Sequence, residues 1–185
     1  MKLDQYGQIM LVAVLLTAVL GLPLLVLLNQ GLVETPYNLF SYNIAILAYV
    51  AWLIALVLMS GLSYINRMTS KIWPGFSLHL HCLLGPLSVV LGLIHYYMSF
   101  SMHEEIVYTG ISGGIIVVGA MVSMMTLRPS KLRRWLHRAI VLGILLIWLH
   151  VHLIVRVANV TPFILAFDVY TLIALAVYIG KRYIK

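Results

Sequence analysis

The sequence predicts an all-α membrane protein with six transmembrane helices, and three observations carry this prediction. Of its 185 residues, 63% are hydrophobic and only 9% are charged, which is not the composition of a soluble protein. The apolar residues form six runs of about 20 residues or more, the length that crosses a bilayer as a helix. Most charges lie in the short segments between these runs. We therefore expect a single domain, residues 1–185, embedded in lipid.

The six helices are expected at the apolar runs. Their approximate ranges are 8–29, 40–64, 76–100, 106–127, 135–157 and 163–183. The first run is longer than the core of a signal peptide, and no small-residue cleavage site follows it, so we expect it to remain as the first helix. The fourth run carries several glycines at spacings that allow close helix contact.

The basic residues predict how the helices are oriented. Eleven of the 12 Lys and Arg residues lie in segments that six crossings place on one side of the membrane, and only Arg156 lies on the other. The eleven are Lys2, Arg67, Lys71, Arg128, Lys131, Arg133, Arg134, Arg138, Lys181, Arg182 and Lys185. Because cytoplasmic loops are enriched in Lys and Arg, both termini are expected to be cytoplasmic. These residues follow the loops and form no nucleic-acid-binding face, so no nucleic acid partner is expected.

Four histidines lie at membrane depth in the third and fifth runs. His81 and His95 are fourteen residues apart, which corresponds to a rise of about 21 Å and a rotation of about 40° along a helix. His137 and His150 are thirteen residues apart, a rise of about 19.5 Å. The third and fifth helices are expected to run parallel, so His81 faces His137 and His95 faces His150. Each pair of imidazoles is suited to bind one haem iron from both sides.

Helical periodicity favours a different outer ligand on the fifth helix. His150 is expected to lie about 140° around the helix from His137, whereas His152 lies only about 60° away. His152 is therefore the alternative outer ligand. A bulge or a kink in the fifth helix, or haems that approach it from different sides, would restore His150 to that role.

Three further polar residues carry expectations. Arg138 follows His137 directly and is expected to contact a haem propionate as well as to orient the helix. Asp168 lies inside the sixth run, where it is expected either to hydrogen-bond a neighbouring helix or to relay a proton. His103, in the loop after the third helix, is expected to be solvated. The single cysteine excludes an intramolecular disulfide and a multi-cysteine metal site.

The pattern resembles the ferric reductase-like transmembrane domain. Ferric reductases, NADPH oxidases and the bacterial haem subunit of the periplasmic methionine sulfoxide reductase system share this domain. The resemblance rests on the two histidine pairs and on the Trp-Leu-His-Arg segment, residues 135–138, at the start of the fifth helix. It implies that His81, His95, His137 and His150 ligate two b-type haems, with His150 preferred over His152. It also implies an integral, multi-pass protein of a bacterial plasma membrane.

The resemblance implies transmembrane electron transfer to an extracytoplasmic acceptor, such as ferric iron or a partner reductase. The chain would be the haem-binding membrane subunit of an oxidoreductase. Members of the family usually continue into a flavin- and nicotinamide-binding domain, whereas this sequence stops at Lys185. The electron donor is therefore expected to be a separate cytoplasmic flavin reductase-type protein, a free flavin or a membrane quinol.

Two alternatives stay open at this point. One is a quinol-linked cytochrome b anchor for a peripheral oxidoreductase, which would use similar histidines. The other is a haem-free transporter that uses the histidines and Asp168 as proton or metal sites. The sequence also leaves open whether one or both haem sites are filled.

Overall fold

The computed structural model describes residues 2–69, 75–99 and 104–183, and the side chains of residues 7–58, 75–99 and 106–180 within them. The described part is all-α. Its helices are α1 (Lys2–Gly31), α2 (Pro36–Thr69), α3 (Phe76–Met98), α4 (Glu104–Thr126), α5 (Lys131–Arg138), α6 (Ile140–Leu153), α7 (Val155–Ala158) and α8 (Thr161–Tyr183). Six segments of the described chain are long and apolar enough to cross a membrane. The predicted fold class, an all-α protein with six membrane-spanning helices, is confirmed.

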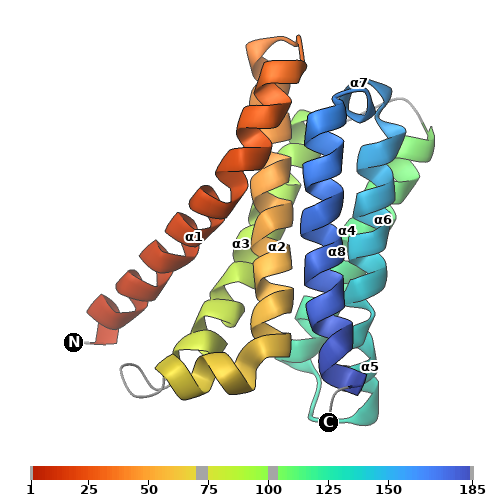
Figure 1. The fold of residues 1–185 in the computed structure, drawn as a ribbon. Helices are drawn as coiled ribbons and strands as arrows, with labels where there is room; N and C mark the ends of the chain where they lie inside the picture. Colours follow the sequence, from red (N-terminus) through yellow and green to blue (C-terminus); the bar gives the residue numbers. More distant parts are fainter. Residues whose placement is uncertain (1, 70–74, 100–103, 184–185) are drawn as a thin grey trace.

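The helices form an elongated bundle in which α3 and α6 run in the same direction (Figure 1). The short helix α5 and both ends of the chain lie at one end of the bundle, which we call the basic end. The α1–α2 turn and α7 lie at the other end, which we call the opposite end. The predicted parallel arrangement of the two histidine-bearing helices is therefore present.

Helix α2 is the centre of the bundle. In its membrane-spanning window 61% of the residues are buried, against 11–28% in the other five spans. Toward the opposite end, Tyr49 of α2 stacks on Phe167 of α8 with ring centroids 4.6 Å apart. Toward the basic end, Ala55 of α2 packs in a second cluster with Leu80 and Leu84 of α3. In lipid, the hydrophobic effect does not drive helices together. These contacts therefore stabilise the bundle through packing and hydrogen bonds between helices.

Two helix boundaries differ from the expected ones for local reasons. Helix α2 begins at Pro36 because proline suits the first helical turn, and the Thr35 hydroxyl accepts a hydrogen bond from the Asn38 N–H. The expected fifth helix, 135–157, instead consists of α5, α6 and α7. It begins earlier because the Ser130 side chain accepts a hydrogen bond from the Arg133 N–H.

Two breaks divide that fifth run. At Ala139 the backbone N–H donates to the carbonyls of Trp135 and Leu136, and the regular helix is interrupted between α5 and α6. At Ile154 the backbone becomes extended, with ψ of 91°, and this ends α6 before the single turn of α7. The first break lies between His137 and His150.

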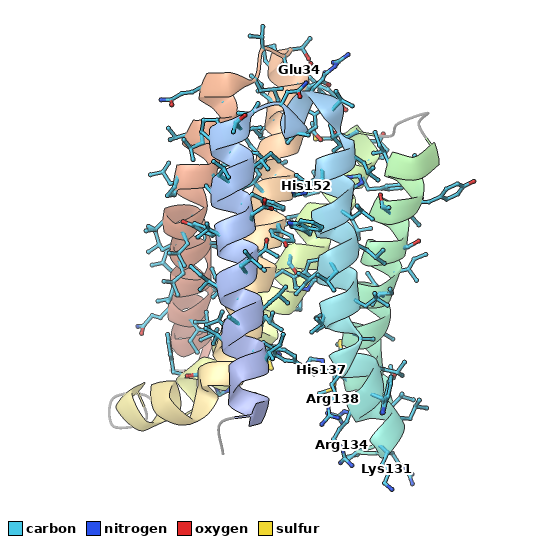
Figure 2. The ribbon with its side chains drawn as sticks, turned by 45° about the vertical axis from the view of Figure 1, so that its right-hand side comes forward. Glu34, Lys131, Arg134, His137, Arg138 and His152 are labelled. Carbon is cyan, nitrogen blue, oxygen red and sulfur yellow. The ribbon has the colours of Figure 1, made fainter. Side chains whose placement is uncertain are left out.

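An ion pair ties the α1–α2 turn to α7 at the opposite end. Arg156 donates to the carboxylate of Glu34, which also accepts a 2.9 Å hydrogen bond from the Asn38 side chain (Figure 2 labels Glu34). The hydrogen bond from Asn38 and then that from Arg156 hold the pKa of Glu34 below its ordinary value of 4.5. The contact joins segments that are 122 residues apart in the sequence.

This contact predicts an acid-dependent loss of stability. A carboxyl group with a lowered pKa stabilises the folded state above its unfolded pKa, and this contribution is lost as the pH falls through the folded pKa. We expect the midpoint of thermal unfolding to fall slightly more steeply below pH 4.5 in the wild type than in Glu34→Gln. The difference will be small because Arg156 is 71% exposed. Parallel pH profiles of the two proteins would exclude this role for Glu34.

Candidate functional site

His95 of α3 and His150 of α6 lie on the wall of one large cavity. The cavity has a volume of about 730 Å³ and is lined almost entirely by apolar residues from α2, α3, α4, α6 and α8. Such a volume and such a lining are typical of pockets that hold a small molecule or a cofactor. The structure therefore brings together the two histidines that were expected to form the outer pair.

His81 of α3 and His137 of α5 form the second pair, toward the basic end. Their ring centroids are 6.0 Å apart and their planes are nearly perpendicular, at 89°. A metal–imidazole nitrogen bond is about 2 Å long and the ring nitrogen lies about 1 Å from the ring centre, so two imidazoles on opposite sides of one metal have centroids about 6 Å apart. The observed separation matches that spacing.

Helix α2 anchors both histidines of α3. The Nδ1 of His81 donates to the backbone carbonyl of Ala55 at 3.1 Å, and the Nδ1 of His95 donates to that of Ser41 at 3.1 Å. Ser41 and Ala55 are fourteen residues apart, as are His81 and His95. The two contacts follow in opposite order along the two helices because α2 and α3 run antiparallel (Figure 1). Both imidazoles thus lie on the face of α3 that packs against α2, as the spacing predicted.

The same type of hydrogen bond orients His150. Its Nδ1 donates to the backbone carbonyl of Ile106 on α4 at 2.8 Å. A Cβ added at Gly110, one turn further along α4, would lie 2.9 Å from the Cε1 of His150, so only glycine leaves room for the ring there. In His81, His95 and His150 the carbonyl fixes the proton on Nδ1 and leaves the lone pair on Nε2. Metal-binding histidines show this arrangement with great regularity.

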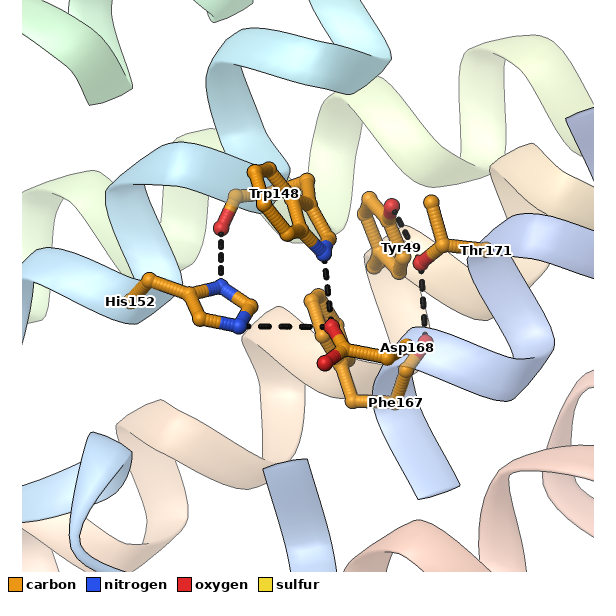
Figure 3. A network of polar contacts seen from close by, with 6 residues as sticks. All are labelled: Tyr49, Trp148, His152, Phe167, Asp168 and Thr171. Atoms are coloured by element: carbon orange, nitrogen blue, oxygen red, sulfur yellow. Dashed lines mark hydrogen bonds and ion pairs between the residues drawn. The ribbon is translucent and has the colours of Figure 1, made fainter. Parts of the chain in front are cut away.

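His152 takes part in a different network of polar contacts, between α6 and α8 (Figure 3). Its Nδ1 donates to the carbonyl of Trp148 at 2.9 Å, and its Nε2 lies 3.3 Å from the carboxylate of Asp168 on α8. The Trp148 indole N–H donates to the same carboxylate oxygen at 2.7 Å. Both ring nitrogens of His152 are therefore engaged. Of the two roles expected for Asp168, the hydrogen bond to a neighbouring helix is present.

Asp168 contacts the side of α6 that faces away from His150. Trp148 and His152 are one turn apart on α6 and both point toward α8, while His150 lies between them in sequence and points the other way. A single carboxylate on α8 thus holds one face of α6, and the opposite face presents His150 to the cavity. The sequence contains the three residues, but only the packing of α6 against α8 brings them together.

We expect Asp168→Ala to destabilise the bundle. It leaves the Trp148 indole N–H without its acceptor and removes the carboxylate beside His152 Nε2, and interhelical hydrogen bonds in membrane proteins contribute about 0.6 to 1.7 kcal/mol. Unfolding in detergent, followed by tryptophan fluorescence, measures the loss. Asp168→Asn keeps an oxygen for Trp148 and should recover part of the stability. An alanine variant as stable as the wild type would show that the network does not hold α6 and α8 together.

The glycines of α4 have two different roles. A Cβ at Gly113 would lie 3.1 Å from the carbonyl oxygen of Gly143 on α6, so this pair permits the close helix contact that the sequence predicted. Gly114 and Gly119, by contrast, line the cavity and have no atom within 4 Å of an added Cβ. Their missing side chains enlarge the cavity.

Two further residues of α2, one beside His95 and one on the cavity wall, had no signal in the sequence that singled them out. Ser41 is fully buried, its hydroxyl lies 3.0 Å from the Nδ1 of His95, and it also contacts the Ser99 hydroxyl. The Trp52 indole Nε1, on the cavity side of α2, is buried without a hydrogen-bond partner among the described residues.

The remaining predicted residues lie at the ends of the bundle. Arg138 is the last residue of α5, directly after His137, and its side chain is exposed (Figure 2). His79, which is expected to be interfacial, lies 2.8 Å through its Nδ1 from the carbonyl of Gly75 in its own first turn. His103 lies outside the described residues.

Among the described residues, no group of three or more His, Cys, Asp or Glu side chains is placed to hold a metal ion by itself. Each histidine pair offers two imidazole ligands, so the remaining positions of a bound metal would be filled by ligands from outside the described residues. No protein-family model, curated protein or solved structure matches this chain at a significant level.

Proposed function

We propose that this protein carries electrons across a membrane through two b-type haems, one between His95 and His150 and the other between His81 and His137. The observation that supports this most strongly is the paired arrangement of the four imidazoles. The members of each pair come from parallel helices, and three of the four have Nδ1 directed at a backbone carbonyl. The resemblance to ferric reductase-like transmembrane domains points to the same chemistry.

The residues around His95 and His150 fit a haem. The cavity of about 730 Å³ is apolar, and it is widened by Gly92, Gly110, Gly114 and Gly119. A flat macrocycle needs such an uninterrupted apolar slot between its two axial ligands.

Haem iron would supply the one-electron chemistry, alternating between its ferric and ferrous states. The chain's own residues provide the rest. The carbonyls of Ala55, Ser41 and Ile106 hold three ligands in the required tautomer. The apolar helices would provide a low-dielectric surrounding for the haems. Arg138 is placed to neutralise a propionate at the basic end.

Two redox centres at different depths would divide a hydrophobic barrier of about 30 Å into short steps. We place the donor, a cytoplasmic flavin reductase-type protein, a free flavin or a membrane quinol, at the basic end. The acceptor, ferric iron or a partner reductase, would lie beyond the opposite end. This orientation follows the positive-inside rule, with both termini cytoplasmic, and is that of a bacterial plasma membrane protein.

The first test is a dithionite-reduced minus oxidised spectrum of the purified chain, with the haem quantified as the pyridine haemochrome. We expect the bands of a b-type cytochrome and two haems per chain. A preparation without haem, even after incubation with added haemin, would contradict the proposal and would favour a haem-free transporter.

A second test addresses transfer itself. Lipid vesicles that contain the protein enclose ferricyanide, and reduced flavin mononucleotide is added outside. We expect the enclosed ferricyanide to be reduced faster than in protein-free vesicles and in vesicles with the His150→Ala variant. Equal rates in all three would mean that the chain does not conduct electrons across the bilayer.

A further inference from the structure

The short helix α5 carries three cations on one face, and its described surroundings hold no carboxylate. Lys131, Arg134 and Arg138 are three and four residues apart, so they stack along one side of the helix, and all three are exposed (Figure 2). Only two carboxylates have described side chains, and both are engaged away from this end. Glu34 contacts Arg156. Asp168 contacts Trp148 and His152.

A second face of α5 is apolar and exposed. Leu132 is 62% exposed and Trp135 is 74% exposed, and they are three residues apart. Arg133, on the remaining side, is turned back onto α4, where it donates to the sulfur of Met124 and to the carbonyl of Leu127, each at 3.3 Å. Helix α5 is thus fixed to the bundle by one side and presents a cationic and an apolar face outward.

The position of α5 relates these faces to the membrane. Helix α5 begins the membrane-spanning segment Lys131–Leu153, so its first turns lie at the depth where headgroups meet acyl chains. Tryptophan is enriched at that depth because its ring is apolar and its N–H is polar. Basic residues beside a transmembrane helix attract anionic lipids of the adjoining leaflet.

From this arrangement we infer that α5 binds the phosphate of an anionic phospholipid through Lys131 and Arg134, with Trp135 and Leu132 against its acyl chains. An acidic protein partner is the rival occupant of the cationic face. The apolar face favours lipid, because a partner in the aqueous phase would leave Trp135 and Leu132 uncovered. This inference does not depend on the proposed electron transfer.

The test is native mass spectrometry of the full chain, titrated with phosphatidylglycerol or phosphatidylcholine at low ionic strength. Lys131→Gln with Arg134→Gln is the test variant, and Arg138 stays unchanged because the proposed function gives it another partner. Lys181→Gln with Arg182→Gln is the control, since it removes the same charge near the C-terminal end of α8. The wild type should retain phosphatidylglycerol preferentially. The test variant should bind it about fivefold more weakly for each cation removed, and the control should bind it like the wild type.

Two results would overturn the inference. Equal retention of the two lipids by the wild type would show that α5 does not select an anionic lipid, and it would favour an acidic protein as the partner of the cationic face. An equal loss in the test and control variants would mean that net charge, and not the face of α5, attracts the lipid. A Trp135→Ala variant adds a check that does not alter charge, because it should weaken phosphatidylglycerol retention without removing any cation.

Discussion

Replacing His95 or His150 with alanine is expected to remove one of the two haems and to abolish transfer across the bilayer. Each substitution would remove one of the two imidazoles proposed to hold a haem in the cavity, and one imidazole would hold it less tightly than two. The haemochrome assay should fall from two haems per chain to one. The haem between His81 and His137 should remain, because that pair is formed by other residues.

His152→Ala is the matched control for His150→Ala. The two histidines are two residues apart on α6, but both nitrogens of His152 contact Trp148 and Asp168. We expect His152→Ala to keep both haems and to lower stability, as Asp168→Ala does. Loss of a haem in His152→Ala, with retention in His150→Ala, would reverse the assignment and agree with ideal helical periodicity.

Filling the cavity from Gly114 is expected to exclude the haem while the bundle still folds. Gly114 lines the cavity and an added Cβ there meets no atom within 4 Å, so a leucine side chain would start in open space and reduce the cavity volume. Gly114→Leu should therefore unfold at a temperature no lower than the haem-free wild type, yet contain one haem per chain at most. Haem content and thermal unfolding of the same preparation measure both effects.

Gly180→Leu is the control for this substitution. Gly180 also has no atom within 4 Å of an added Cβ, but it lies near the end of α8 and does not line the cavity. It should keep the haem content of the wild type. If Gly114→Leu retained two haems, the cavity would not be the haem site, and another ligand would have to account for its volume.

The regular part of the site could be predicted from the sequence. Helix α3 is continuous from Phe76 to Met98, so the fourteen residues between His81 and His95 place both rings on one face, as expected. The start of α2 could also be predicted from the sequence, because Thr35 and Pro36 form a common helix-initiating pair.

The irregular part could not be predicted, since it depends on contacts between helices. Ala139 carries no local signal for a break, being neither glycine nor proline, yet α5 and α6 separate there. The position of His150 is set by the carbonyl of Ile106 and by the space that Gly110 leaves on α4. These residues are distant in sequence from α6, so periodicity within the fifth run pointed to His152 instead.

The most direct test of the central claim is to locate iron in the protein. A cryo-electron microscopy map of the purified chain in a nanodisc would show whether a planar group occupies the cavity of about 730 Å³. The account predicts such a group with the Nε2 atoms of His95 and His150 on its two faces, and a second one between His81 and His137. A cavity filled by lipid or water, with the four imidazoles unligated, would contradict it.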